Sequence, residues 1–549
     1  MRLEPSSTSA DADEPMISRP YLSVLLLAAA LLPADGAAQQ PGEVERTLPL
    51  PGVFGLYDDR LRVAQILGRA STDGYLLRST STLLPALPHD SVPTFRLQFL
   101  LPDLKGVWNS DIPYTFNDGA LWAGRGANLH LTGGIRAAFG PVVVVFAPEL
   151  RYEENRPFDF VPYPLADRSQ YSARWHWATL PISVDMPTRF GDEERAALGP
   201  GQLTVTASVG PVRFGWARDD QWWGPGVRNA IVMSNNAPGV PRIFVRTGPP
   251  VSTPIGDFEI LWNAGVLQES VYFDTINHNG RRHLSGLAFT YRPAGEPGLT
   301  VGLARTVFGR LRAFDDFPQE MFSAIMPAES KEEQVFSAFG RWIFPAAGFE
   351  AYGEWARYRM TTSLRDFLVN PNHTQGYTVG AQWVHPVRAD SSGFLRLHGE
   401  ITYLEQSTTT RHRPTGSFYT SLDVPQGYTQ RGQILGAAIG PGSSSQWIAG
   451  DYLADDWQLG VFGGRIRWDN DAYYLTQEPF PLDHDVSFFG GLRGATRIGP
   501  AWLELEYTRT RRYNFMFQNE STSLGEPGTW DLNNNTLRLT IRPGRLPEL

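Results

Sequence analysis

The chain has 549 residues, of which 12% are aromatic and 54 are glycine, and it contains no cysteine. The lack of cysteine excludes a disulfide scaffold, a thiolate metal site and a cysteine nucleophile. The formal net charge of −9 argues against a nucleic-acid partner, because phosphate binding needs lysine and arginine clustered on one face. No shift in composition divides the chain, so one large architecture is the simplest interpretation.

The N-terminus predicts a secretory signal peptide. Residues 21–32 (YLSVLLLAAALL) form an apolar run that follows Arg19 and precedes small residues through Ala38. The run is too short for a membrane-spanning helix, which needs about 20 residues. We assign residues 1–38 to a cleaved signal peptide and expect the mature chain to begin near Gln39. Met16 is a candidate true start, because the acidic residues before it fit no signal pattern.

A short N-terminal segment, residues 39–93, is expected to lie on the periplasmic side. Residues 57–68 (YDDRLRVAQILG) carry apolar side chains at helical spacing, with two aspartates in the first turn and Gly68 as the stop. We therefore predict a short amphipathic helix there. Because it precedes the residues predicted to form a β-barrel, we expect it to be a plug or cap at the periplasmic mouth of that barrel.

Residues 94–549 are predicted to form an antiparallel, all-β barrel that crosses the outer membrane. Apolar and polar residues alternate in four clear stretches, which are residues 202–209, 395–403, 503–508 and 536–542. A period of two places one set on each face of a strand. A soluble sandwich alternates in the same way, so the pattern of turns has to decide between the two folds.

Short turns recur along the chain and are separated by longer aromatic and charged connections. Seven turns are found at residues 139–141, 210–211, 249–256, 293–298, 345–348, 386–393 and 499–500. Short turns at one end and long loops at the other are typical of outer-membrane barrels. With an eighth turn expected between Arg431 and Arg467, the pattern predicts at least sixteen strands. A barrel of this width is expected to have a lumen and not a packed core.

Charged residues on the polar phase of the strands are expected to face the lumen and to form ion-pair ladders that fix the register. They are Glu350, Glu354, Arg396, Glu400, Glu504, Glu506, Arg538 and Arg542. The last strand is expected to end near Arg542. Residues 543–549 run past it and end on Leu549, which counts against a barrel, because such chains commonly end on an aromatic residue.

The stretch 218–241 (RDDQWWGPGVRNAIVMSNNAPGVP) is the most distinctive part of the chain. Aromatic faces and fixed polar groups are what sugar recognition requires. Candidate ligand-binding residues are Asp219, Asp220, Trp222, Trp223, Asn235 and Asn236, with Trp175 and Trp177 from a preceding aromatic loop. The structural alternative is favoured for this stretch: a strand, a sharp bend and a re-entering strand that shape the barrel.

The loop over residues 152–177 is rich in aromatic residues, and it has two interpretations. Tyrosine and tryptophan girdles at the membrane interfaces account for about two in three of them. The rest are candidates for stacking on sugar rings.

No enzyme motif stands out, and we predict no catalytic residue, no metal site and no cofactor. Glu504 and Glu506 form a carboxylate pair that a glycosidase could use, although such pairs are common on the polar phase of barrel strands. The loop triplet at residues 483–485 (DHD) offers a metal or base constellation, but solvated loop charge is the favoured interpretation.

Several segments together resemble the capsule assembly protein Wzi family. Besides residues 218–241 they are residues 185–191 (DMPTRFG), 350–354 (EAYGE), 365–367 (RDF), 373–380 (HTQGYTVG), 398–400 (HGE) and 428–442 (YTQRGQILGAAIGPG). They follow the family's order over about residues 50–543. The resemblance implies an outer-membrane barrel of about eighteen strands that acts as a lectin for capsular polysaccharide.

Three functional classes follow from the sequence. The first is a non-catalytic outer-membrane protein that binds capsular or extracellular polysaccharide and supports capsule assembly. The alternatives are a diffusion channel and, less favoured, an outer-membrane glycan or lipid hydrolase. We expect a monomer in contact with outer-membrane lipid, and no nucleic-acid partner.

Overall fold

The computed structural model describes residues 46–87, 95–164, 166–173, 183–275, 280–327, 332–359, 363–387, 393–475, 483–518 and 530–549. The predicted signal peptide and Met16 lie outside these ranges, as do the candidate residues Trp175 and Trp177. Among the helices within these ranges, none is long and apolar enough to cross a membrane.

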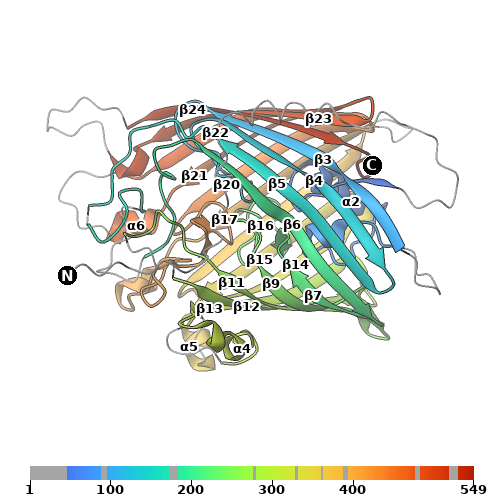
Figure 1. The fold of residues 1–549 in the computed structure, drawn as a ribbon, viewed down its shortest axis with the longest axis horizontal. Coiled ribbons are helices and arrows are strands. Elements are labelled where there is room, and N and C mark those ends of the chain that lie inside the picture. The colour runs from blue at the N-terminus through green and yellow to red at the C-terminus, as the bar shows by residue number, and fades with distance from the viewer. Residues whose placement is uncertain are drawn as a thin grey trace, which may run out of the picture.

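Within the described ranges, eighteen strands pair antiparallel and close into one barrel (Figure 1). The first and last wall strands, β3 and β24, pair with each other, and β9 pairs with both β7 and β11. The wall strands are β3 (Phe95–Asn109), β4 (Gly126–Phe139), β5 (Val142–Glu153), β6 (Arg195–Val209), β7 (Val212–Ala217), β9 (Arg242–Thr247), β11 (Gly256–Leu267), β12 (Arg282–Pro293), β13 (Leu299–Arg310), β14 (Glu333–Phe344), β15 (Phe349–Tyr358), β16 (Gln375–Pro386), β17 (Gly393–Tyr403), β20 (Ser444–Ala454), β21 (Trp457–Arg467), β22 (Val486–Ile498), β23 (Ala501–Tyr513) and β24 (Leu532–Pro543). The predicted all-β barrel of about eighteen strands is confirmed.

The remaining elements lie beside the wall or between its strands. The short strands are β1 (Thr47–Pro49), β2 (Leu77–Ser79), β8 (Gln221–Trp223), β10 (Val251–Thr253), β18 (Thr429–Gln430) and β19 (Gln433–Ile434). The helices are α2 (Leu56–Ile66), α3 (Thr80–Leu83), α4 (Phe317–Glu320), α5 (Leu364–Val369) and α6 (Asn470–Leu475). Single 3-10 turns are η2 (Phe314–Asp316), η3 (Pro345–Ala347), η4 (Thr408–Arg411) and η5 (Phe515–Phe517).

The alternation of apolar and polar residues sets the two faces of the wall. In β17, Leu395, Leu397 and Ile401 are exposed on the outer surface, whereas Arg396 and Glu400 are buried on the lumen side. Because an apolar outer surface suits a lipid environment and charges there are costly, this division fits a membrane barrel.

The predicted short turns lie at one end of the barrel, called here the turn end. Gly140, Gly210 and Gly499 each take a positive φ in a tight hairpin that joins two wall strands. The eighth turn is found at Asp455 and Asp456, between β20 and β21. Part of the predicted turn at residues 386–393 lies outside the described ranges. The opposite end, where long connections join the strands, is called the loop end.

The predicted N-terminal helix is confirmed as α2, which ends before Gly68 at a φ of +70°. Arg60 donates hydrogen bonds to the carbonyl oxygens of Ala454 and Asp455, both 3.1 Å away in the β20–β21 turn region. The helix therefore lies inside the barrel at the turn end, near the C-terminus (Figure 1).

Ion pairs join α2 to the wall. The Nε atom of Arg62 lies 2.7 Å from Glu350, and Asp59 pairs with Arg396 at 2.6 Å. Glu350 also pairs with Arg341 of the neighbouring strand β14 at 2.7 Å. The expectation that these charges face the lumen is confirmed. The expected ladder between wall strands is only part of the arrangement, because most of these charges bond to segments inside the lumen.

The C-terminal tail explains why the chain continues beyond its last strand. Leu546 is buried against Leu56 of α2 and Trp502 of the wall, and Leu549 is buried against Val63 and Ile66 of α2. The seven residues after Arg542 thus complete the plug. Their presence does not count against a barrel.

The expectation of a lumen without a packed core is wrong for this chain. One buried apolar cluster joins lumen-facing wall residues such as Leu284 and Phe308 to Ile231, Tyr428 and Ile434 of inward-folded connections. Wall side chains alone cannot fill a barrel of this width. The connections at the loop end fill it, and they turn the lumen into a protein interior.

Removing Glu350 leaves Arg62 and Arg341 without their shared buried carboxylate. We expect Glu350→Ala to lower the free energy of unfolding by about 3–5 kcal/mol, because an unpaired buried charge is costly. The measurement is a urea titration of the barrel folded in lipid vesicles. The control is Asp456→Ala in an exposed turn, which should change stability by less than about 1 kcal/mol. Equal effects of the two variants would contradict the assignment.

Candidate functional site

Residues 218–241, called here the lumen segment, leave the wall after β7 and rejoin it at β9. Their strand β8 pairs antiparallel with β2 and not with any wall strand. The wall is already continuous at this point, because β7 pairs directly with β9. The predicted strand, bend and re-entering strand therefore do not shape the wall as expected. The segment folds into the lumen instead.

The two aspartates at the start of the lumen segment bond to protein groups. Asp219 is buried, pairs with Arg242 at 2.5 Å, and accepts hydrogen bonds from the backbone and side chain of Ser81. Asp220 exchanges hydrogen bonds with the side-chain amide of Gln202. Burial raises the pKa of Asp220 to about 7, and the carboxylates of Glu149 and Asp219 add to the rise.

The two tryptophans are packed inside the barrel, with exposures of 0% for Trp222 and 1% for Trp223. Trp222 stacks on Phe54 at a ring distance of 5.7 Å and donates its indole N–H to the carbonyl of Gly226. The backbone N–H of Trp223 donates to Met233, which holds the two arms of the segment together. Their burial fits a role in bracing the barrel interior.

The two asparagines join neighbouring connections inside the barrel. The side-chain amide of Asn235 donates to the carbonyl of Asn117, and that of Asn236 donates to the carbonyl of Ile434, both at 3.1 Å. Direct ligand contact stays a prediction for six candidates, which are Asp219, Asp220, Trp222, Trp223, Asn235 and Asn236. The structure places all six against protein.

The Gly-Pro-Gly bend of the lumen segment needs glycine at both positions. Gly224 has a φ of +91°, and a Cβ there would lie 3.1 Å from a carboxylate oxygen of Glu354. A Cβ on Gly226 would lie 2.4 Å from the carbonyl oxygen of Asn229. A residue with a side chain is therefore excluded at Gly224 by the backbone conformation, and at Gly226 by the close approach of the Asn229 carbonyl.

Two wall glutamates hold the backbone of the bend. Glu400 of β17 accepts hydrogen bonds from the N–H groups of Val227, Arg228 and Asn229, at 2.5–3.2 Å. Glu354 of β15 accepts one from Ile231 at 3.0 Å. Buried backbone N–H groups must be paired, and an irregular bend offers no strand partner. The two carboxylates provide the missing acceptors.

A pocket of about 270 Å³ opens among the connections at the loop end. Its aromatic lining includes Tyr114, Trp122, Phe158, Trp468 and Phe515. The side chains come from connections far apart in the chain, and Trp468 is partly exposed.

Polar groups lie beside these rings. Asp485 forms a two-point ion pair with Arg512 at 2.7 and 2.8 Å, and Trp468 donates its indole N–H to Ser487. The guanidinium of Arg512 lies 4.8 Å from the ring centre of Trp468 and 4.6 Å from that of Phe515. Rings with oriented polar groups at their edges suit a sugar.

The favoured interpretation of the loop triplet at residues 483–485 is wrong for one member. Asp485 is 3% exposed and is not solvated loop charge, because Arg512 holds it against the pocket. The described part of the aromatic loop also behaves differently from a membrane girdle. The ring of Phe160 packs against those of Phe158 and Tyr171 at centroid distances of 5.8 and 6.0 Å, and Phe158 lines the pocket.

Sequence reasoning missed most of the pocket. Trp468 and Arg512 carry no local motif, and they approach each other only because β21, β22 and β23 are neighbours in the wall. Glu504 and Glu506, considered as a hydrolase pair, lie on β23, where Glu506 approaches Arg538 at 4.0 Å.

Comparison with known proteins supports the family resemblance. Residues 111–310 match the profile of the family described as capsule assembly protein Wzi. No curated protein matches the chain. The expected resemblance to this family is confirmed for the matched residues, which contain the whole lumen segment.

Among solved structures, the barrel is similar to Wzi of Escherichia coli, an outer-membrane protein involved in group 1 capsule assembly that is described as a carbohydrate-binding β-barrel. The two are 12% identical with a TM-score of 0.53, over 81% of this chain and 85% of that one. OprD of Pseudomonas aeruginosa is 8% identical with a TM-score of 0.35, over 80% and 94%. OccAB2 of Acinetobacter baumannii is 10% identical with a TM-score of 0.37, over 80% and 96%.

Replacing Gly226 tests the close approach in the bend. We expect Gly226→Ala to lower the free energy of unfolding by about 1–3 kcal/mol, because the added methyl group displaces the Asn229 carbonyl. The control is Gly295→Ala in the β12–β13 turn, where a Cβ meets no atom within 4 Å. If both variants unfold at the same urea concentration, the bend is not as tight as described.

The raised pKa of Asp220 predicts a dependence on pH. A carboxyl whose pKa is higher in the folded state favours folding below its unfolded pKa of about 4, and this contribution is lost as pH rises toward 7. Asp220→Asn cannot ionise, so its stability relative to the parent should grow by about 1–3 kcal/mol between pH 5 and pH 8. Urea titrations at both pH values measure it. A constant difference would contradict the environment described for Asp220.

Proposed function

We propose that this chain is a non-catalytic outer-membrane protein that binds capsular or extracellular polysaccharide at the cell surface and supports capsule assembly. The observation that carries the proposal is the match of residues 111–310 to the capsule assembly protein Wzi family. It is supported by an aromatic pocket that opens where the long connections gather.

The barrel accounts for the cellular location. Its apolar outer surface suits the outer membrane, where the protein contacts lipid. Export through a signal peptide over residues 1–38 is part of the proposal, as are the periplasmic segment 39–93 and the barrel over 94–549. On this topology the turn end, with α2, faces the periplasm, and the loop end faces outward. We propose a monomer, because the barrel closes on itself without a second chain.

The loop-end pocket is the proposed contact for the polymer. A sugar ring presents C–H groups to aromatic faces and hydroxyls to polar groups, and Trp468, Arg512 and Asp485 offer both within one cavity. The lumen segment has a supporting role in this proposal. Its side chains pack inside the barrel, and Asn235 and Asn236 donate hydrogen bonds to neighbouring connections, which keeps these connections in place.

The packed lumen also bears on the alternatives. A diffusion channel requires a continuous water-filled path, but the described connections bury an apolar cluster across the barrel. A hydrolase that uses Glu504 and Glu506 requires substrate to reach both carboxylates on β23. Neither alternative has an observation in its favour comparable to the family match.

Replacing Trp468 tests the pocket. We expect Trp468→Ala to weaken binding of the host's own surface polysaccharide about 10-fold, because the ring is the largest partly exposed apolar face in the pocket. The measurement is equilibrium binding of fluorescent polysaccharide to the refolded protein, together with polymer retention on cells that express the variant.

The matched control is Trp457→Ala. Trp457 begins the same strand, β21, at the turn end, and Trp468 directly follows that strand at the loop end. Trp457→Ala should bind polymer normally. If Trp468→Ala folds and retains polymer as well as this control, the pocket is not the binding site. If the parent protein binds no polysaccharide, the proposed function itself fails.

A further inference from the structure

The connection between β13 and β14 folds back over the outside of the barrel. Residues 311–327 of this connection, called here the outer flap, include α4, which Figure 1 shows beyond the wall. The hydroxyl of Ser285 on β12 donates to the carbonyl of Met321 and accepts from the backbone N–H of Ala324. Arg305 on β13 donates to the carbonyl of Met326 at 2.7 Å. The flap is thus bound to the wall by polar contacts.

These contacts lie on the outer face of the wall. Arg282 and Leu284 of β12 point into the lumen, where Arg282 donates to Gly427 and Leu284 joins the apolar cluster. The alternation of a strand then places His283 and Ser285 on the outer face. Phe322 of the flap stacks on Trp262 of β11 at 5.2 Å, so the flap covers this part of the wall.

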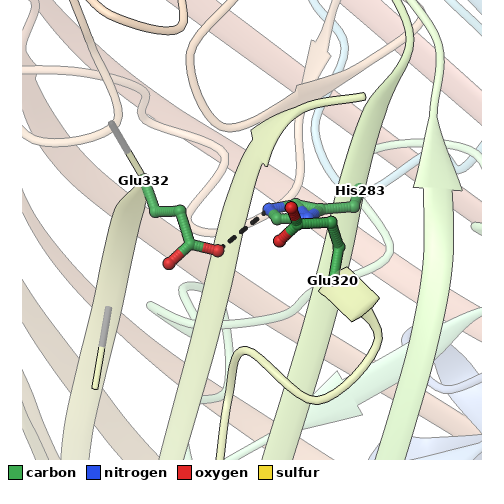
Figure 2. A group of neighbouring side chains, drawn as sticks. All are labelled: His283, Glu320 and Glu332. Atoms are coloured by element: carbon green, nitrogen blue, oxygen red, sulfur yellow. Dashed lines mark ion pairs between the residues drawn. The ribbon is translucent and has the colours of Figure 1, made fainter. Parts of the chain in front are cut away.

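Under the flap, His283 lies between two carboxylates from different segments. Its Nδ1 is 3.2 Å from Glu320 of α4, and its Nε2 is 3.4 Å from Glu332, the residue before β14. One atom from each of the three residues can be chosen so that all lie within 4.8 Å of one another. Figure 2 shows the imidazole with both carboxylates directed toward it.

The histidine is unusual for a buried polar residue. It is 1% exposed, and the contacts of its two ring nitrogens with the carboxylates do not have hydrogen-bond geometry. Buried polar atoms are almost always hydrogen-bonded, so a ring nitrogen left in this state points to a ligand or an ion. The side chain of Glu320 is 27% exposed, which gives an ion access from solution.

We propose that His283, Glu320 and Glu332 bind one divalent transition-metal cation, such as Zn²⁺, which fastens the outer flap to the barrel wall. One imidazole and two carboxylates form a set that suits Zn²⁺, whereas Ca²⁺ prefers a larger set made only of oxygen atoms. Bonds of about 2.1 Å bring ligand atoms to within about 4.2 Å, so a small rotation of one glutamate completes the set.

The cation would act on the position of the flap. Its ligands come from β12 in the wall, from α4 in the flap and from the residue before β14, so binding crosslinks three segments. We call the flap closed when it lies against the wall and open when it does not. An ion that binds only the closed form lowers the population of the open form, by a factor set by the ion concentration divided by the dissociation constant of the ion. This role is separate from polysaccharide binding in the loop-end pocket.

The test uses untagged, refolded protein that has been stripped of metal with a chelator. Titration calorimetry with Zn²⁺, and absorption of bound Co²⁺, should report one site. Saturating Zn²⁺ should slow hydrogen exchange of the amides in residues 311–327 by about 10-fold or more. His283→Ala and Glu332→Gln should each weaken Zn²⁺ binding at least 10-fold, and Glu332→Gln preserves the shape of the side chain should the first variant fail to fold.

His130→Ala is the matched control. His130 also contacts a glutamate, Glu149, at 3.0 Å, but as a hydrogen-bonded pair on neighbouring strands. This variant should bind Zn²⁺ like the parent. The proposal is overturned if the parent binds no Zn²⁺, if Ca²⁺ or Mg²⁺ binds as tightly, or if Glu332→Gln leaves binding and exchange in the flap unchanged.

Discussion

Backbone N–H groups that enter the lumen of a wide barrel lose water and need another acceptor. At the bend of the lumen segment the acceptors are carboxylates on the wall. Glu400 receives three successive N–H groups of residues 227–229, and Glu354 receives that of Ile231. Because a charged acceptor makes stronger hydrogen bonds than a neutral one, two side chains can hold a bend that has no strand partner.

At the turn end, ion pairs between side chains anchor the plug to the wall. There the cations come from both the plug and the wall: Arg62 of α2 pairs with Glu350, and Arg396 of β17 pairs with Asp59. Apolar side chains then fill the space between these anchors, with Leu546 and Leu549 of the C-terminal tail as part of the plug. The result is a barrel with polar anchors and a packed core. Such an interior gives the loop-end connections a fixed base.

The sequence predicted the wall well, because strand periodicity and turn chemistry are local. Alternation placed Glu350 and Arg396 on the lumen side, and Gly210-Pro211 marked a true hairpin. The sequence could not predict that residues 218–241 fold into the lumen, because tryptophans such as Trp222 and Trp223 also occur in wall strands. The sequence also did not predict the pocket. Trp468 and Arg512 lie in contact because the strands that carry them are close in the wall, and no sequence motif connects the two residues. Long-range contacts of this kind depend on the closed topology, which no local pattern contains.

The lumen is a packed interior, and we propose that the protein holds polymer at its surface without conducting ions through its core. Planar-bilayer recording of the refolded barrel measures whether the core conducts. We expect no steady conductance from the parent protein under conditions in which an open porin of similar width conducts. Steady, stepwise conductance from the parent protein would show instead that an open path crosses the lumen.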